Sequence, residues 1–197
     1  MVKPFFFYLK ASNLIMKEWF ERKTVAVVGN AQSLIEQRFG PEIDQAEVVV
    51  RINRGGYRFV EFQKQMGTKL DVWCMQNMRQ NKAHFQRPHT QNIPRMQMDT
   101  IDVSPEFANL ADTIFSQEDR KALDSNLTKK SSTGLRVLYY ISKCNPKKVF
   151  TYGFDWKKTY SWHERRKCVA HLFNEERDYC FQNFFNTDVF VLRGYQE

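Results

Sequence analysis

The hydrophobic pattern along the chain predicts short strands that are buried on both faces. Val25–Val28 is a run of four apolar residues that stops at Gly29 and Asn30. Short apolar runs bounded by turn residues are typical of parallel strands covered by helices. The same pattern predicts further strands at Glu47–Asn53, Leu70–Met75, Thr100–Val103, Lys148–Tyr152 and Asp188–Leu192.

Capping residues and apolar spacing predict helices between these strands. Ser33, with Glu36 three residues later, has the pattern of a capping box for a helix to about residue 39. Ser131 or Ser132 caps another helix, whose apolar face contains Leu135, Leu138 and Ile141. Other helices are expected at residues 57–66, from Ser104, from Ser116, and from about 171 to 185.

This order of elements predicts one α/β domain over residues 24–197. We expect a Rossmann-like open sheet, mostly parallel and flanked by helices. Residues 76–98 lack any periodicity and predict a long loop with some helix. The basic residues of that loop either contact an anionic ligand or are simply solvated.

The first 23 residues mix aromatic and basic side chains. Phe5–Leu9 is too short for the apolar region of a signal peptide. No apolar run reaches the roughly 20 residues that span a bilayer. We expect a helix packed on the domain, and an interfacial anchor on anionic lipid is the alternative.

The net charge of +8 indicates an anionic partner, and it does not distinguish a nucleotide, a glycolipid, a membrane surface or nucleic acid.

The cysteines Cys74, Cys144, Cys168 and Cys180 are too widely spaced for a disulfide framework, which favours a reducing compartment. His163, Cys168, His171 and Cys180 match no compact zinc pattern, so we expect no metal site.

Three segments have residue types suited to ligand chemistry. Gly29 and Asn30 follow a buried strand, where open α/β sheets bind nucleotides, although an ordinary turn would look the same. The segment lacks the glycine patterns of dinucleotide and ATP sites. Small residues around Ser132 would let a phosphate or carboxylate approach backbone N–H groups. The His171 imidazole could accept a proton, or it could be an ordinary surface histidine.

Taken in order, these segments resemble the sialyltransferase family of glycosyltransferases, family 29, which includes the animal Golgi enzymes. His171 and Glu176 match the H-x4-E pattern of the family's very short motif. Tyr160–Glu164 lies where the third motif is found. The long sialylmotif is matched by Val25–Asn30 with Val50–Asn53, and the short one by Ser132–Gly134 with Tyr152–Phe154.

The resemblance implies an inverting, metal-independent transferase on the family's GT-A-like fold. Its donor would be a CMP-activated sugar acid, such as sialic acid or Kdo, and its acceptor a glycan or glycolipid such as lipopolysaccharide. No cofactor is implied, and the chain lacks the D-x-D pattern that holds a metal in many other transferases. The resemblance assigns donor binding to Gly29, Asn30, Ser33, Asn53, Ser132, Thr133, Gly134 and Tyr160.

The resemblance also assigns the reacting groups. His171 would be the general base on the acceptor hydroxyl, and His163 or Tyr160 would assist the departing phosphate. Glu176 would support His171 by reaching back toward the start of its own helix.

The chain departs from the animal enzymes in two ways. The resemblance implies that Val25 stands where those enzymes have a disulfide-bonded cysteine, and we expect no counterpart of their transmembrane anchor and stem. Both departures fit a short, soluble, cytoplasmic protein of bacterial or viral type, with peripheral contact at the inner membrane left open.

Two alternatives to an active transferase remain: a weakly active CMP-sugar or glycan-binding member of the family, and a basic nucleic-acid-binding protein. Because no basic stripe interleaved with aromatics is evident, we expect no nucleic-acid partner.

Overall fold

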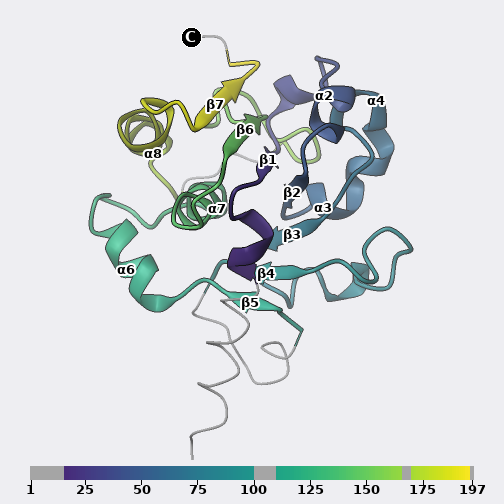
Figure 1. Cartoon of the computed structure of the whole chain (residues 1–197), viewed down its shortest axis with the longest axis horizontal. Coiled ribbons are helices and arrows are strands. Elements are labelled where there is room, and N and C mark those ends of the chain that lie inside the picture. Colours follow the sequence, from purple (N-terminus) through teal and green to yellow (C-terminus); the bar gives the residue numbers. More distant parts are fainter. Residues whose placement is uncertain (1–15, 100–109, 166–169, 196–197) are drawn as a thin grey trace, which may run out of the picture.

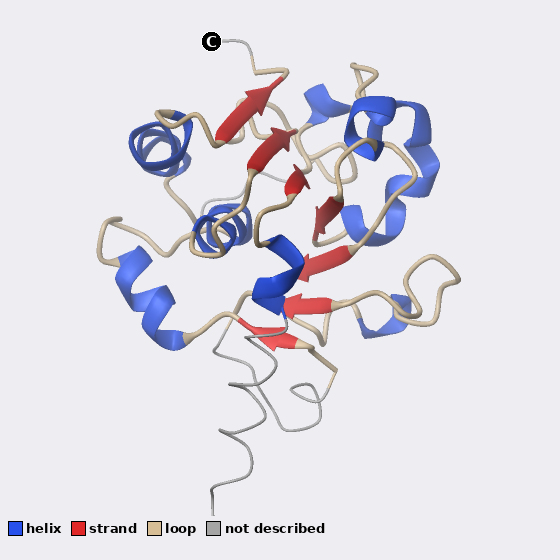
Figure 2. Cartoon of the chain, viewed as in Figure 1, coloured by secondary structure: helices blue, strands red, loops and turns tan. Residues whose placement is uncertain are grey.

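The computed structural model describes residues 16–99, 110–165 and 170–195. In these residues, seven parallel strands form one sheet, with helices on both faces (Figures 1 and 2). The strands are β1 (Thr24–Val28), β2 (Val48–Ile52), β3 (Val72–Met75), β4 (Arg95–Gln97), β5 (Thr113–Ile114), β6 (Lys148–Tyr152) and β7 (Phe190–Arg193).

The strand order is β5-β4-β3-β2-β1-β6-β7, so β1 lies between β2 and β6. The chain moves outward from β1 to β5 and then returns to the opposite side of β1 with β6 (Figure 1). The place where the direction of winding reverses is a topological switch point, and open α/β sheets bind ligands there, beyond the strand carboxyl ends. The predicted open, parallel sheet is confirmed.

The helices divide between the two faces of the sheet (Figure 2). The longer α6, α7 and α8 lie on one side, and α2, α3 and α4 lie on the other (Figure 1). Their bounds are η1 (Gln32–Leu34), α2 (Gly40–Asp44), α3 (Gly55–Arg58), η2 (Phe59–Phe62), α4 (Gln63–Met66), η3 (Lys82–His84), α6 (Gln117–Asp124), α7 (Thr133–Ser142), α8 (Phe173–Cys180) and the π-helical turn η4 (Phe181–Phe185).

The alternation of side chains along β1 explains its continuous apolar run. Val25 and Val27 join the core that includes Leu135 and Leu138 of α7. Ala26 and Val28 join the core on the opposite face. A strand buried on both faces needs apolar residues at every position, because successive side chains point to opposite sides.

The predicted caps of α6 and α7 are confirmed, and the one at Ser33 is wrong. The hydroxyls of Ser116 and Ser132 accept the backbone N–H groups of Asp119 and Leu135. Ser33 instead lies inside η1, a short 3-10 helix without a side-chain cap. The loop before Ser33 is bonded instead to the segment after β6, because the N–H of Gln32 donates to the Tyr160 carbonyl at 2.8 Å.

Two other predicted segments differ from the structure. The region predicted as a long loop contains β4, whose Met96 is buried and paired with β3. The strand predicted at residues 100–103 and the helix start at Ser104 lie outside the described residues. Residues 16–20 are helical and bury Met16 and Phe20 in the core, whereas the rest of the predicted N-terminal helix lies outside the described residues. Within the described residues, no helix has the length and apolar character needed to cross a bilayer.

Candidate functional site

A cavity of about 670 Å³ opens at the carboxyl ends of β1 and β6, at the switch point of the sheet. Its lining comes from the ends of β1 and β2, residues 76–81, the first half of α7, residues 153–164 and residues 171–180. Nine of the eleven predicted site residues line it: Gly29, Asn30, Asn53, Ser132, Thr133, Gly134, His163, His171 and Glu176.

The floor of the cavity is a close backbone contact between the loops that follow β1 and β6. The N–H of Gly29 donates to the Tyr152 carbonyl at 2.8 Å. A Cβ atom on Gly29 would lie 2.5 Å from the carbonyl oxygen of Gly153, which is closer than such atoms can approach. Gly153 itself has a φ of 67°, a conformation that favours glycine. Both glycines are therefore needed for this approach.

Asn30 presents a buried acceptor beside the cavity. Its Nδ2 donates to the carbonyl of Ile52 at 3.1 Å, which ties the end of β1 to β2. Its Oδ1 is buried and has no hydrogen-bond partner among the described residues. Leaving a buried acceptor unpaired costs about 1–3 kcal/mol, so a ligand N–H or O–H that reached it would bind favourably.

Asn53 occupies the end of β2 with a φ of 49°, in the left-handed region that asparagine tolerates. Its Oδ1 accepts the backbone N–H of Gln76 at 2.8 Å, and its carbonyl accepts the indole N–H of Trp73 at 2.7 Å. These bonds fix the Asn53 side chain at the cavity wall, and no described residue accepts a hydrogen bond from its amide nitrogen.

His163 lies in the loop that follows β6, and both of its ring nitrogens are buried without a partner among the described residues. Burial, reinforced by the positive charge of Arg54, lowers the pKa of His163 to about 4. The ring is therefore neutral at physiological pH and carries one N–H to donate. Arg54 and Lys157 also line the cavity, as do the carboxylates of Asp155, Glu164 and Glu176, and Arg54 is paired with Glu164 at 3.3 Å.

The start of α7 already holds a carboxylate from the chain itself. The N–H and hydroxyl of Ser132 donate to Glu176 at 2.7 and 2.6 Å. The next two backbone N–H groups, those of Thr133 and Gly134, have no partner among the described residues, and both residues line the cavity. Of the three residues predicted to hold an anion here, Ser132 is therefore occupied by Glu176, and the backbone N–H groups of Thr133 and Gly134 stay as candidates.

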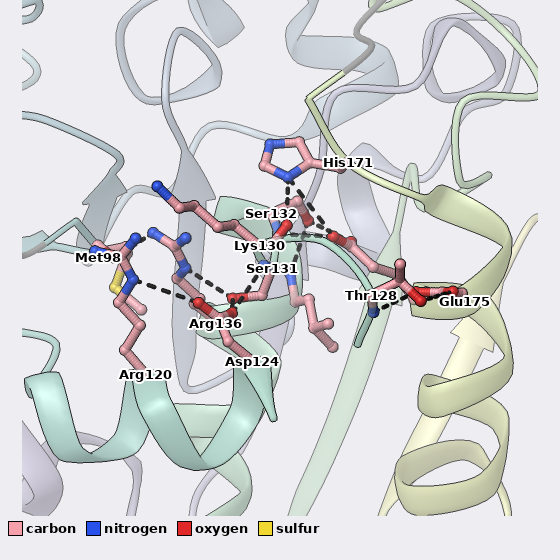
Figure 3. A network of polar contacts seen from close by, with 12 residues as sticks. Met98, Arg120, Asp124, Thr128, Lys130, Ser131, Ser132, Arg136, His171 and Glu175 are labelled. Atoms are coloured by element: carbon pink, nitrogen blue, oxygen red, sulfur yellow. Dashed lines mark hydrogen bonds and ion pairs between the residues drawn. The ribbon is translucent and has the colours of Figure 1, made fainter. Parts of the chain in front are cut away.

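His171 is held by a backbone carbonyl. Its Nδ1 lies 2.7 Å from the carbonyl oxygen of Lys130 (Figure 3). A carbonyl oxygen only accepts hydrogen bonds, so Nδ1 carries the hydrogen, and in the neutral ring Nε2 keeps its lone pair. Nε2 is then able to take a proton from a ligand in the cavity.

Glu176 supports this arrangement by a route that differs from the prediction. Its carboxylate binds Ser132, the cap residue before α7, rather than the start of its own helix α8. Its Oε1 lies 4.0 Å from Nδ1 of His171, where a negative charge would stabilise the protonated ring. Burial raises the pKa of Glu176, and its bonds to Ser132 oppose that rise.

Ser33 and Tyr160 do not line the cavity. Tyr160 is 46% exposed, and its backbone carbonyl accepts the N–H of Gln32.

Sequence reasoning missed Gln80 and Asn81, which line the cavity and come from a segment without any hydrophobic periodicity. The described residues contain no group of three or more metal-binding side chains, and Cys168 lies outside them.

A family model for glycosyltransferase family 29 (sialyltransferase) matches residues 10–149. The chain belongs to this family. The matched region contains the ends of β1 and β2 and the start of α7, and it stops before His163 and His171. The chain is a sialyltransferase-like glycosyltransferase. No curated protein matches it in sequence.

Solved sialyltransferases share the fold. A mammalian sialyltransferase in complex with Gal-β1-3GalNAc-ortho-nitrophenol is 17% identical, with a TM-score of 0.67 over 93% of this chain and 73% of that one. The CstII sialyltransferase from Campylobacter jejuni in complex with CMP is 12% identical, with a TM-score of 0.58 over 87% and 80% of the two chains. An α-2,3-sialyltransferase from the same organism is 13% identical, with a TM-score of 0.59 over 87% and 75%.

Proposed function

We propose that this protein transfers sialic acid or a related sugar acid from a CMP-activated donor to a hydroxyl of a glycan, without a metal and with inversion. The observation that carries the proposal is a cavity at the switch point whose lining residues include unpaired polar atoms. Asn30 Oδ1 is an acceptor, and the backbone N–H groups of Thr133 and Gly134 are donors. A nucleoside monophosphate offers the complementary groups.

Two of the structural neighbours support this choice of donor and acceptor. CstII has been solved with CMP and with the substrate analogue CMP-3FNeuAc. The mammalian neighbour has been solved with Gal-β1-3GalNAc-ortho-nitrophenol. We extend to this chain the idea of a cytidine nucleotide on the β1 side of the cavity and a glycan hydroxyl near His171.

In the proposed reaction, Nε2 of His171 removes the proton of the acceptor hydroxyl. The acceptor oxygen forms a bond to the anomeric carbon from the face opposite CMP, the bond from that carbon to the phosphate oxygen breaks, and CMP leaves. The proton remains on His171 until solvent removes it. A positioned general base contributes about 10²–10⁴-fold to the rate.

The departing phosphate would be stabilised by groups already fixed in the protein. These are one N–H of His163, the backbone N–H groups of Thr133 and Gly134, and the charges of Arg54 and Lys157. Such preorganised donors stabilise charge that develops in the transition state, so this chemistry does not require a metal ion.

The charge of +8 also suits an anionic glycolipid acceptor, and we place the activity in the cytoplasm, with peripheral contact at the inner membrane.

Thermal denaturation with CMP, UDP, GDP and ADP, each once with EDTA and once with manganese, tests the proposal. We expect CMP to raise the midpoint most, because a ligand at a hundred times its dissociation constant stabilises a protein by about 2.7 kcal/mol. Transfer from CMP-sialic acid and CMP-Kdo to a panel of glycans would follow. A shift seen only with UDP and manganese would reject the CMP donor.

A further inference from the structure

Three residues of the loop before α7 are each held in the same way. Thr128, Ser131 and Ser132 each donate both a backbone N–H and a side-chain hydroxyl to one carboxylate. The three carboxylates are Glu175 and Glu176 in the first turn of α8, and Asp124 at the end of α6. We call these six residues the carboxylate clamp. Figure 3 shows most of it, with both helices converging on the loop.

Lys130 lies in the middle of the clamped loop, and its carbonyl accepts Nδ1–H of His171. Thr128 is held on one side of it by bonds of 2.8 and 2.6 Å to Glu175. Ser131 is held on the other side by bonds of 2.8 and 2.5 Å to Asp124. A peptide unit bracketed in this way has little freedom to rotate, so its carbonyl keeps one direction.

Two buried arginines, Arg120 and Arg136, bind residues of the clamp. Arg136 donates to the Ser131 hydroxyl at 2.9 Å and to the carbonyl of Met98 at 2.8 Å (Figure 3). Burial by itself would raise the pKa of Asp124, but the Ser131 bonds and the charges of Arg136 and Arg120 outweigh it and lower that pKa. Asp124 therefore stays ionised, and charge-assisted hydrogen bonds of this kind are among the stronger ones in proteins.

We propose that the carboxylate clamp positions His171 for proton transfer by fixing the Lys130 carbonyl, which selects the imidazole tautomer with its hydrogen on Nδ1. The proposal rests on the proposed function for the identity of the base. It adds Thr128, Glu175 and Asp124 as positioning residues, and none of these three lines the cavity. If the carbonyl turns away, the neutral ring can place its hydrogen on Nε2, and that nitrogen can no longer accept a proton.

The direct test is the tautomer of His171 in the full-length protein, free of ligand. Long-range ¹H–¹⁵N spectra at about pH 9, where an imidazole is neutral, distinguish Nδ1–H from Nε2–H. The chain has four histidines, and His171→Gln would assign the signal. We expect Nδ1–H in the parent protein and a mixture in Thr128→Val and Glu175→Gln. Thr128→Ser keeps both bonds and should restore the parent spectrum.

Kinetics provide the second readout. Thr128→Val and Glu175→Gln should lower kcat about tenfold, with KM for the CMP donor within about twofold, because misplacing a reacting group slows the chemical step. Asp178→Asn removes the same charge from an exposed residue of α8 that is paired with Arg177, and it serves as the matched control. Thermal midpoints of all variants would show whether each is folded.

Two results would overturn the proposal. One is a parent protein whose neutral His171 carries its hydrogen on Nε2. The other is an unchanged tautomer and unchanged kcat in folded Thr128→Val and Glu175→Gln. The spectra need no substrate, so they decide the role of the clamp even if the protein neither binds CMP nor transfers a sugar. Loss of the proposed function alone would instead appear as the expected spectra without CMP-dependent activity.

Discussion

The two ends of the cavity differ in how their polar atoms are satisfied. At the β1 end, Asn30 Oδ1 and both ring nitrogens of His163 are buried and unpaired within the described structure. At the α7 end, Ser132 is bonded to Glu176, and His171 is bonded to the Lys130 carbonyl. The β1 end therefore offers unpaired side-chain atoms, whereas at the α7 end the Ser132 side chain and Nδ1 of His171 are already bonded and the backbone N–H groups of Thr133 and Gly134 are what a ligand could reach.

The difference suggests separate tasks for the two histidines. The neutral ring of His163 has no hydrogen-bond partner among the described residues, which suits it to donate a hydrogen bond to a ligand. Nδ1 of His171 is bonded to the Lys130 carbonyl, so the lone pair of Nε2 is the one suited to remove a proton. Binding and chemistry should then respond differently to substitutions at the two ends.

Substitution of His171 should have the largest effect. We expect His171→Ala to lower kcat about 10²-fold or more, the usual scale for loss of a general base, while the dissociation constant for CMP changes little. Steady-state transfer assays with calorimetric titration of CMP would measure both. If His171→Ala kept near-parental turnover and His163→Ala abolished it, the roles of the two histidines would have to be exchanged.

Substitution of Asn30 should have the next largest effect, and on binding rather than on turnover alone. We expect Asn30→Ala to weaken CMP binding about tenfold, because the lost acceptor contributes on the order of 1–2 kcal/mol. Ser33→Ala, a few residues away and outside the cavity, is the control and should bind CMP as the parent does. Equal weakening in both variants would indicate a general loss of structure.

The smallest effect concerns pH and stability. The pKa of His163 is about 4 in the folded protein, against an ordinary value of 6.5, so the unfolded chain binds more protons between these values. The contribution of His163 to stability is therefore fully present above pH 6.5 and is lost as the pH falls toward 4. We expect His163→Gln to flatten this part of the profile of thermal midpoint against pH. An identical profile in both proteins would contradict the burial of His163.

Much of the fold could be predicted because its signals are local. The strand Lys148–Tyr152 has the predicted bounds, and α7 begins at its predicted serine cap. The helix predicted after Ser33 does not form as such, because that loop bonds to residues that lie more than a hundred positions later in the sequence. Strand β4 escaped prediction because it is three residues long, which leaves no period to detect.

The candidate site was predictable to the extent that its residues belong to motifs. Asn30 and His171 line the cavity as expected, but the motifs could not show what each side chain contacts. The bond between Ser132 and Glu176 joins residues 44 positions apart, and the partner of His171 is a backbone carbonyl that has no sequence signature. Partners of these kinds become visible only in three dimensions.

The switch point also has a consequence for the order of folding. Strand β1 pairs with β2, which follows it closely, and with β6, which arrives about 120 residues later. Pairings between distant residues form slowly, because a long loop must close before they give any stabilisation. During synthesis, β1 and β2 can associate early, while the other edge of β1 waits for β6 to leave the ribosome. The seam between β1 and β6, which carries the site, is therefore expected to close later than the pairing of β1 with β2.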